Sequence, residues 1–245
     1  MFQFGMDRKT LYIIMAVLVV MSLGRYLTDT NALLSLVLTL PAVLIAITFH
    51  EYAHAFAADR LGDDTPRRQG RLTLNPLAHL DPVGSIMLVF AGFGWGKPVE
   101  INPRNFNRTV SMSKGEAIVS IAGPIMNFIL AFVFSIISVA IIKFAPSFLF
   151  TQLGSIIITL LQVTVSINVG LGVFNLIPLP PLDGSKVLSH FLPYSAKDWF
   201  ARYSQVFYIV FVVLWITGIA GDIISPIISL VYSGITNLVG LLFGI

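Results

Sequence analysis

Long apolar runs separated by shorter polar segments dominate the pattern of the 245-residue chain. A helix needs about 20 predominantly apolar residues to span the hydrocarbon core of a bilayer. Six runs approach this length, at residues 11–27, 33–58, 117–142, 153–177, 206–220 and 223–245. The pattern therefore predicts an all-α polytopic membrane protein with about six transmembrane helices.

The first run, residues 11–27, is the shortest, and it is interrupted at Gly24 and Arg25. Because Arg8 and Lys9 precede it, two interpretations remain open: a cleaved signal peptide or a retained membrane anchor. We favour the anchor, in which Arg25 reaches the interface by snorkelling.

Positive charges are distributed unequally between the predicted loops. With six spans and a cytoplasmic N-terminus, every Lys and Arg except Arg25 and Lys143 lies in a terminus or in a loop near residues 59–116 or 178–205. Lys and Arg accumulate in cytoplasmic loops. The sequence therefore predicts a protein of the cytoplasmic membrane whose N-terminus faces the cytoplasm.

The loop at residues 59–116 contains two patterned segments. Residues 71–75 alternate like a short strand, and residues 83–93 are apolar but too few to cross a bilayer. Irregular backbone at membrane depth needs cover from protein or water, so we expect a re-entrant hairpin or an interfacial element between the second and third spans. No repeat or linker marks a second domain, and residues 1–245 are expected to form a single one.

Composition supports the membrane prediction and excludes several kinds of chemistry. The chain is 56% hydrophobic and 11% charged, whereas soluble domains carry roughly 25% charged residues. A net charge of +3 without a basic patch argues against a nucleic-acid partner. Because the chain has no cysteine, thiolate nucleophiles and cysteine-ligated metals are excluded, and any metal must bind histidine and carboxylate.

Three ionisable residues stand together inside the second predicted span. His50, Glu51 and His54 form the pattern H-E-x-x-H, although each such group costs roughly 2.5 to 3.5 kcal/mol within a membrane. Helical spacing places both histidines on one face, where two imidazoles can bind one zinc ion. Glu51 is offset by about 100° and can reach a metal-bound water without being a ligand. The alternative is a polar cluster hydrogen-bonded to neighbouring helices.

A catalytic zinc site needs a third protein ligand and one open position. Asp183 is the candidate, because Pro178, Pro180 and Pro181 end or unwind the fourth span just before it. Gly184 is expected to let the backbone turn immediately after Asp183. An unwound segment can aim a side chain at a neighbouring helix, whereas the plainer interpretation is an ordinary turn.

These motifs resemble those of the site-2 proteases, a family of intramembrane zinc metalloproteases, over most of the chain. The matching residues are His50, Glu51 and His54, then Asn175, Pro178, Asp183 and Gly184, with residues 122–127 similar to the G-P-x-x-N element of the family. Residues 70–82 and 94–99 resemble the small bacterial and archaeal branch, without PDZ or CBS domains. The resemblance implies that His50, His54 and Asp183 bind Zn²⁺ and that Glu51 is the general base and acid.

Two asparagines are candidates for binding substrate. A tetrahedral oxyanion needs a donor besides the metal, and Asn127 or Asn175 can supply an amide N–H without adding charge. For Asn127, which we favour, the alternative is an interhelical hydrogen bond, and we expect such a bond for Asn168. His79 is expected to cap or hydrogen-bond locally, and His190 is expected to lie in a cytoplasmic amphipathic stretch outside the metal site.

The sequence thus predicts a zinc endopeptidase that cleaves transmembrane segments of membrane-protein substrates near the cytoplasmic face of the lipid bilayer. Residues 71–75 or 92–97 are either an edge to which an unwound substrate adds as a strand or a surface loop. The alternative function is a membrane metal transporter or a non-catalytic scaffold. Glu51 separates these classes, because a carrier does not need a non-ligating carboxylate beside the metal.

Overall fold

The computed structural model describes residues 19–20, 24, 26–91 and 96–244. Helices and turns make up this part of the chain, which contains one isolated antiparallel bridge, between Leu80 and Gly96, and no β-strand. The prediction of an all-α protein is therefore confirmed for the described residues.

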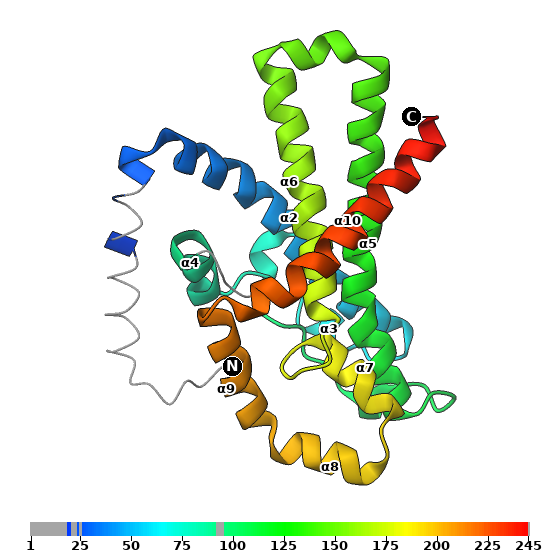
Figure 1. The fold of residues 1–245 in the computed structure, drawn as a ribbon. Helices are drawn as coiled ribbons and strands as arrows, with labels where there is room; N and C mark the ends of the chain where they lie inside the picture. The colour runs from blue at the N-terminus through cyan, green and yellow to red at the C-terminus, as the bar shows by residue number, and fades with distance from the viewer. Residues whose placement is uncertain (1–18, 21–23, 25, 92–95, 245) are drawn as a thin grey trace.

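Four helices are long and apolar enough to cross a membrane: α2 (Thr30–Arg60), α5 (Met112–Phe144), α6 (Gln152–Asn175) and α10 (Ile219–Phe243). They correspond to four of the six predicted runs. A short 3₁₀ helix, η3 (Pro146–Phe150), joins α5 to α6, which run side by side in opposite directions, and α10 crosses both (Figure 1). Because α2 also packs against α5 and α6, these three helices form the frame of the molecule.

Side-chain caps define where the long helices begin. The carboxylate of Asp29 accepts hydrogen bonds from two backbone amides of α2, Ser111 caps α5, and Thr151 caps α6. Such caps satisfy amides that have no partner within the helix and typically contribute about 1 kcal/mol. The polar residues that separate the apolar runs thus fix the ends of the helices.

The two remaining predicted spans are not confirmed. Most of residues 11–27 lies outside the described residues. The run at residues 206–220 forms α9 (Ser204–Ile216), a helix of 13 residues, and the chain turns at Gly218, whose φ is +79°. At 1.5 Å per residue, α9 is about 20 Å long and shorter than the roughly 30 Å hydrocarbon core.

The loop between α2 and α5 contains short helices: α3 (Thr65–Arg68), η1 (Pro76–Ala78), α4 (Pro82–Ala91) and η2 (Pro103–Asn105). The strand predicted at residues 71–75 is wrong. The Asn75 side chain caps η1, while the Arg71 side chain binds backbone carbonyls of other segments, so this stretch bends instead of extending. The apolar segment forms α4 as far as Ala91, residues 92–93 lie outside the described residues, and the Leu80–Gly96 bridge joins the flanks of this stretch; the predicted hairpin is not confirmed.

The segment between α6 and α9 contains two helices, α7 (Asp183–Phe191) and α8 (Tyr194–Arg202). Gly184 does not form the predicted turn, because it is already helical within α7. A Cβ atom at Gly184 would lie 2.2 Å from the carbonyl oxygen of Leu176. Glycine therefore allows the start of α7 to pack directly on the end of α6.

Candidate metal centre

His50, His54 and Asp183 meet at one point between α2 and α7. The Nε2 atoms of His50 and His54 are 3.0 Å apart, and each lies 3.2 Å from Oδ2 of Asp183. Both histidines are buried, and one donor atom from each of the three residues falls within 4.8 Å of the others. The structure thus brings together the three residues that the sequence predicted as metal ligands.

The outer nitrogens of both imidazoles are held by uncharged groups. His50 Nδ1 lies 2.6 Å from Oδ1 of Asn127, and His54 Nδ1 lies 2.7 Å from the carbonyl oxygen of Val119. Because both partners are acceptors, each Nδ1 carries the hydrogen and donates it. Each Nε2 lone pair is then free to face Asp183, which is the arrangement that metal-binding histidines adopt.

The chemistry of this donor set fits zinc. Two imidazole nitrogens and one carboxylate oxygen are a typical set of three protein ligands at a catalytic zinc, and the fourth position remains for water. These three side chains bind a metal in their deprotonated forms, which are two neutral imidazoles and one carboxylate.

Glu51 lies beside the cluster but is not part of it. One of its carboxylate oxygens, Oε2, accepts a hydrogen bond of 3.0 Å from the backbone N–H of Val99. The side chain is half-buried, whereas His50 and His54 are buried. This position is the one expected of a carboxylate that exchanges protons without binding the metal.

Asn127 connects three helices behind the cluster. Its Oδ1 accepts from His50, and its amide nitrogen donates to the carbonyl of Ala46 at 3.2 Å and to Oδ1 of Asn168 at 2.9 Å. Asn168 in turn donates to the carbonyl of Thr164. Interhelical hydrogen bonds are thus confirmed for Asn168, and both amide hydrogens of Asn127 are engaged in them.

The predicted contacts of Asn127 and Asn175 with substrate stay predictions. Both amide hydrogens of Asn127 are already donated to Ala46 and Asn168, so neither is available to a substrate carbonyl. Asn175 donates to the carbonyl of Leu171, one turn back in its own helix. A role as oxyanion donor would require either side chain to exchange its present partner for the substrate.

Removing the amide of Asn127 should weaken metal binding. We expect Asn127→Leu to reduce zinc affinity by about 10- to 100-fold, because outer partners of metal-binding histidines contribute this much. Zinc titration of the purified protein measures the effect. Asn237→Leu, at an exposed asparagine of α10, is the matched control and should bind zinc as the wild type does. Equal affinities of the two variants would contradict the role of Asn127.

Gly123 is the glycine of the G-P-x-x-N element, and the sequence predicted no role for it. A Cβ atom there would lie 2.5 Å from Nε2 of His54 and 2.6 Å from Cε1 of His50. The absent side chain lets α5 approach α2 closely enough to form one wall of the cluster. Gly123 stands four residues before Asn127, hence on the same helix face, and this spacing was the available signal.

A single methyl group at Gly123 should disrupt the cluster. We expect Gly123→Ala to lose at least about 10-fold in zinc affinity, because the backbone of α5 cannot retreat without breaking its packing on α2. Metal analysis after purification measures this loss. In the control Gly170→Ala, the added Cβ would meet its nearest atom at 3.9 Å, and normal metal content is expected. A full complement of zinc in Gly123→Ala would show that α5 can accommodate a methyl group beside the two histidines.

The two other histidines lie outside the cluster, as expected. His79 is fully buried, and its Nε2 donates to the carbonyl of Thr73 at 2.8 Å. His190 Nδ1 lies 3.3 Å from the hydroxyl oxygen of Ser113. Local hydrogen bonding is therefore confirmed for His79, whereas the contact of His190 joins α7 to the start of α5.

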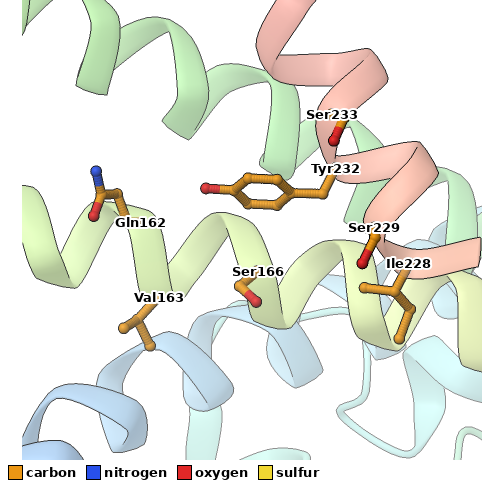
Figure 2. Close-up of a pocket in the computed structure, with 7 residues that line it drawn as sticks. All are labelled: Gln162, Val163, Ser166, Ile228, Ser229, Tyr232 and Ser233. Atoms are coloured by element: carbon orange, nitrogen blue, oxygen red, sulfur yellow. The ribbon is translucent and has the colours of Figure 1, made fainter. Parts of the chain in front are cut away.

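A cavity of about 480 Å³ lies between α6 and α10, away from the metal cluster. Figure 2 shows that Tyr232 projects from α10 across Ser166 towards Gln162 of α6. The cavity is lined by Gln162, Val163, Ser166, Ile228, Ser229, Tyr232 and Ser233. None of these residues is a predicted ligand or base, so the cavity is separate from the candidate metal centre.

Comparison with known proteins places this geometry in a family. Residues 150–218 match the profile of Peptidase family M50. The chain is 36% identical over 208 residues to "Putative zinc metalloprotease YwhC" of Bacillus subtilis, and this match covers 85% of the chain and 92% of the relative. The chain belongs to peptidase family M50. The resemblance to site-2 proteases is thereby confirmed.

A second relative agrees with this membership of family M50. "Putative zinc metalloprotease Rip2" of Mycolicibacterium smegmatis is 32% identical over 185 residues, which cover 74% of this M50 chain and 67% of the relative. No solved structure matches the chain. The names of both relatives contain zinc, in agreement with the two imidazoles and one carboxylate that converge here.

Proposed function

We propose that this M50 peptidase is a zinc-dependent intramembrane endopeptidase. Its substrates are membrane proteins, and it hydrolyses peptide bonds in or near their transmembrane segments. The observation that carries the proposal is the meeting of His50, His54 and Asp183 from two distant segments, with Glu51 beside them but outside the ligand set. This arrangement is built on helices apolar enough to lie in a bilayer.

Zinc bound by these three residues would act as a Lewis acid and lower the pKa of a water molecule to about 7. The residues of the chain supply the proton transfers. Oε2 of Glu51 is engaged by Val99, so Oε1 is the oxygen available to take a proton from the attacking water. Glu51 then gives this proton to the leaving amine, as a general base followed by a general acid.

The proposed site faces the cytoplasm in the cytoplasmic membrane. His54 and His50 lie 6 and 10 residues before Arg60, the end of α2, which corresponds to a depth of roughly 9 to 15 Å. Peptide carbonyls of a helical substrate are engaged in the helix, so the substrate must unwind locally before hydrolysis. A docking role for residues 92–97 stays a prediction, because residues 92–95 lie outside the described chain.

Cleavage of defined substrates by the purified protein tests this proposal. The full chain in detergent is incubated with a panel of single-span membrane proteins, and its bound metal is measured in parallel. We expect cleavage within or next to a span, loss of cleavage on chelation, and recovery on addition of zinc. Bound zinc without hydrolysis of any substrate, together with zinc flux in vesicles, would instead support the transporter.

A further inference from the structure

Arg71 is a buried cation whose partners are backbone carbonyls. The residue is 4% exposed, and the ion pairs found among the described residues do not include it. Its guanidinium donates hydrogen bonds to the carbonyls of Ala78, Lys97 and Pro98, the last at 2.9 Å. Burying an arginine without a carboxylate partner costs free energy of folding. A structural or functional role for Arg71 would explain why the protein bears this cost.

The carbonyls that Arg71 binds belong to two segments that meet above α2. The backbone N–H of Lys97 donates to the carbonyl of His79 at 2.8 Å, next to the Leu80–Gly96 bridge. A Cβ atom at Gly96 would lie 2.9 Å from Cγ2 of Ile47 on α2. Residues 96–98 are therefore fixed from one side by Arg71 and pressed against α2 on the other.

The next residue along this segment makes the contact with Glu51. Because Arg71 binds the carbonyls of Lys97 and Pro98, it fixes the peptide group from which the N–H of Val99 extends. That N–H donates to Oε2 of Glu51, and Oε1 lies 3.8 Å from the position of a Cβ at Gly96. The orientation of the carboxylate thus depends on a segment that Arg71 holds in place.

We propose that Arg71 is a positioning residue for Glu51. It acts through residues 97–99, whose backbone holds one carboxylate oxygen and leaves the other directed at the reacting water. This inference rests on the proposed function, in which Glu51 transfers the proton. Misplacement of a reacting group by about 1 Å can cost on the order of 100-fold in rate, so fixing the carboxylate has a large effect on turnover.

The chemistry of this position favours arginine over lysine. A guanidinium presents a planar fork of donors that can bind several carbonyls at once, whereas an ammonium is a compact charge on a flexible stem. Burial lowers the pKa of Arg71, and the negative charges of Glu51 and Glu100 oppose this shift. The guanidinium of arginine remains protonated in proteins, so Arg71 places a positive charge near Glu51 without forming an ion pair that would occupy the carboxylate.

The test compares Arg71→Gln and Arg71→Lys with Arg68→Gln, which removes an exposed arginine of the same loop. Zinc content and the kinetics of substrate cleavage are measured on each purified full chain. We expect Arg71→Gln to lower kcat by about 10- to 100-fold with KM changed less than about 3-fold and zinc content unchanged. Arg71→Lys should fall between Arg71→Gln and wild type, and Arg68→Gln should equal wild type.

A double substitution shows whether Arg71 acts through Glu51. The shorter carboxylate of Glu51→Asp does not reach the Val99 N–H, so adding Arg71→Gln to it should cost less than about 3-fold in kcat. If Arg71→Gln does not fold, Val99→Pro, which removes the N–H itself, should give the same fall in kcat with zinc retained.

Two results overturn the inference. One is a normal kcat per zinc-loaded molecule in Arg71→Gln or Val99→Pro, and the other is an equal loss from Arg71→Gln in the Glu51→Asp background. The cleavage rate of Glu51→Gln, measured in the same assay, is the reference for both results. If Glu51→Gln is inactive and Arg71→Gln is normal, only the role of Arg71 falls. If Glu51→Gln cleaves normally, the proposed function itself has failed.

Discussion

Glu51→Gln is expected to reduce peptide cleavage by about 100- to 10,000-fold while zinc remains bound. The amide has the size of the carboxylate and can still accept from the N–H of Val99, but it cannot take a proton from water. Metal binding should persist, because Glu51 is not one of the three converging ligands. Single-turnover cleavage and metal analysis of the same preparation measure both effects.

Glu100→Gln is the matched control for this substitution. Glu100 is an exposed glutamate that accepts a hydrogen bond from Gln69 and is not one of the three candidate ligands. Its replacement should leave both cleavage and zinc content unchanged. Undiminished hydrolysis by Glu51→Gln would exclude a base role for this residue, and loss of its zinc would show that Glu51 is a ligand.

Asp183→Ala is expected to have the second large effect, loss of the metal together with loss of cleavage. The carboxylate lies 3.2 Å from Nε2 of both histidines and is the only charged ligand in the cluster. Loss of a hydrogen-bond partner behind a metal ligand typically weakens metal binding by about 10- to 100-fold. Loss of a direct ligand should weaken zinc binding by at least the upper value, about 100-fold. Isothermal titration with zinc measures the affinity, and cleavage is assayed at saturating zinc.

The control for Asp183 is Asp198→Ala, which removes an exposed carboxylate paired with Arg202 in α8. Exposed pairs of this kind contribute about 0 to 1 kcal/mol to stability, so zinc binding and activity should be those of the wild type. Retention of wild-type zinc affinity by Asp183→Ala would remove this residue from the ligand set and undermine the proposed hydrolysis.

The meeting of the three candidate metal ligands was predictable because its signals are local. The spacing of His50 and His54 specifies one helix face, and the prolines before Asp183 indicate where the preceding helix ends. The four long helices followed from the length of their apolar runs. In each case a few neighbouring residues determine the backbone, and tertiary packing only has to bring the pieces together.

The errors arose where distant contacts determine the backbone. Residues 71–75 alternate like a strand, but the hydrogen bonds of Arg71 to remote carbonyls bend the chain there. Gly184 has no positive φ, and its small size serves the packing of α7 on α6. Sequence pattern does not distinguish a glycine needed for a turn from one needed for close contact.

Backbone groups around the site had no signal in the sequence at all. The carbonyl of Val119 holds His54, and the N–H of Val99 holds Glu51, yet any residue other than proline would offer the same N–H. Only the fold specifies which peptide group faces which side chain. The side chains of the centre were therefore predictable, whereas the groups that orient them were not.

The bridge between Leu80 and Gly96 affects which parts of this loop can tolerate changes in sequence. Because it joins the ends of the intervening stretch, that stretch can be lengthened, shortened or rewritten while the peptide groups next to Glu51 keep their places. Surface connections tolerate such changes far better than the scaffold that holds them. Sequence changes between the two bridge residues are therefore expected to be tolerated, whereas changes at residues 96–99 would displace the N–H that contacts Glu51.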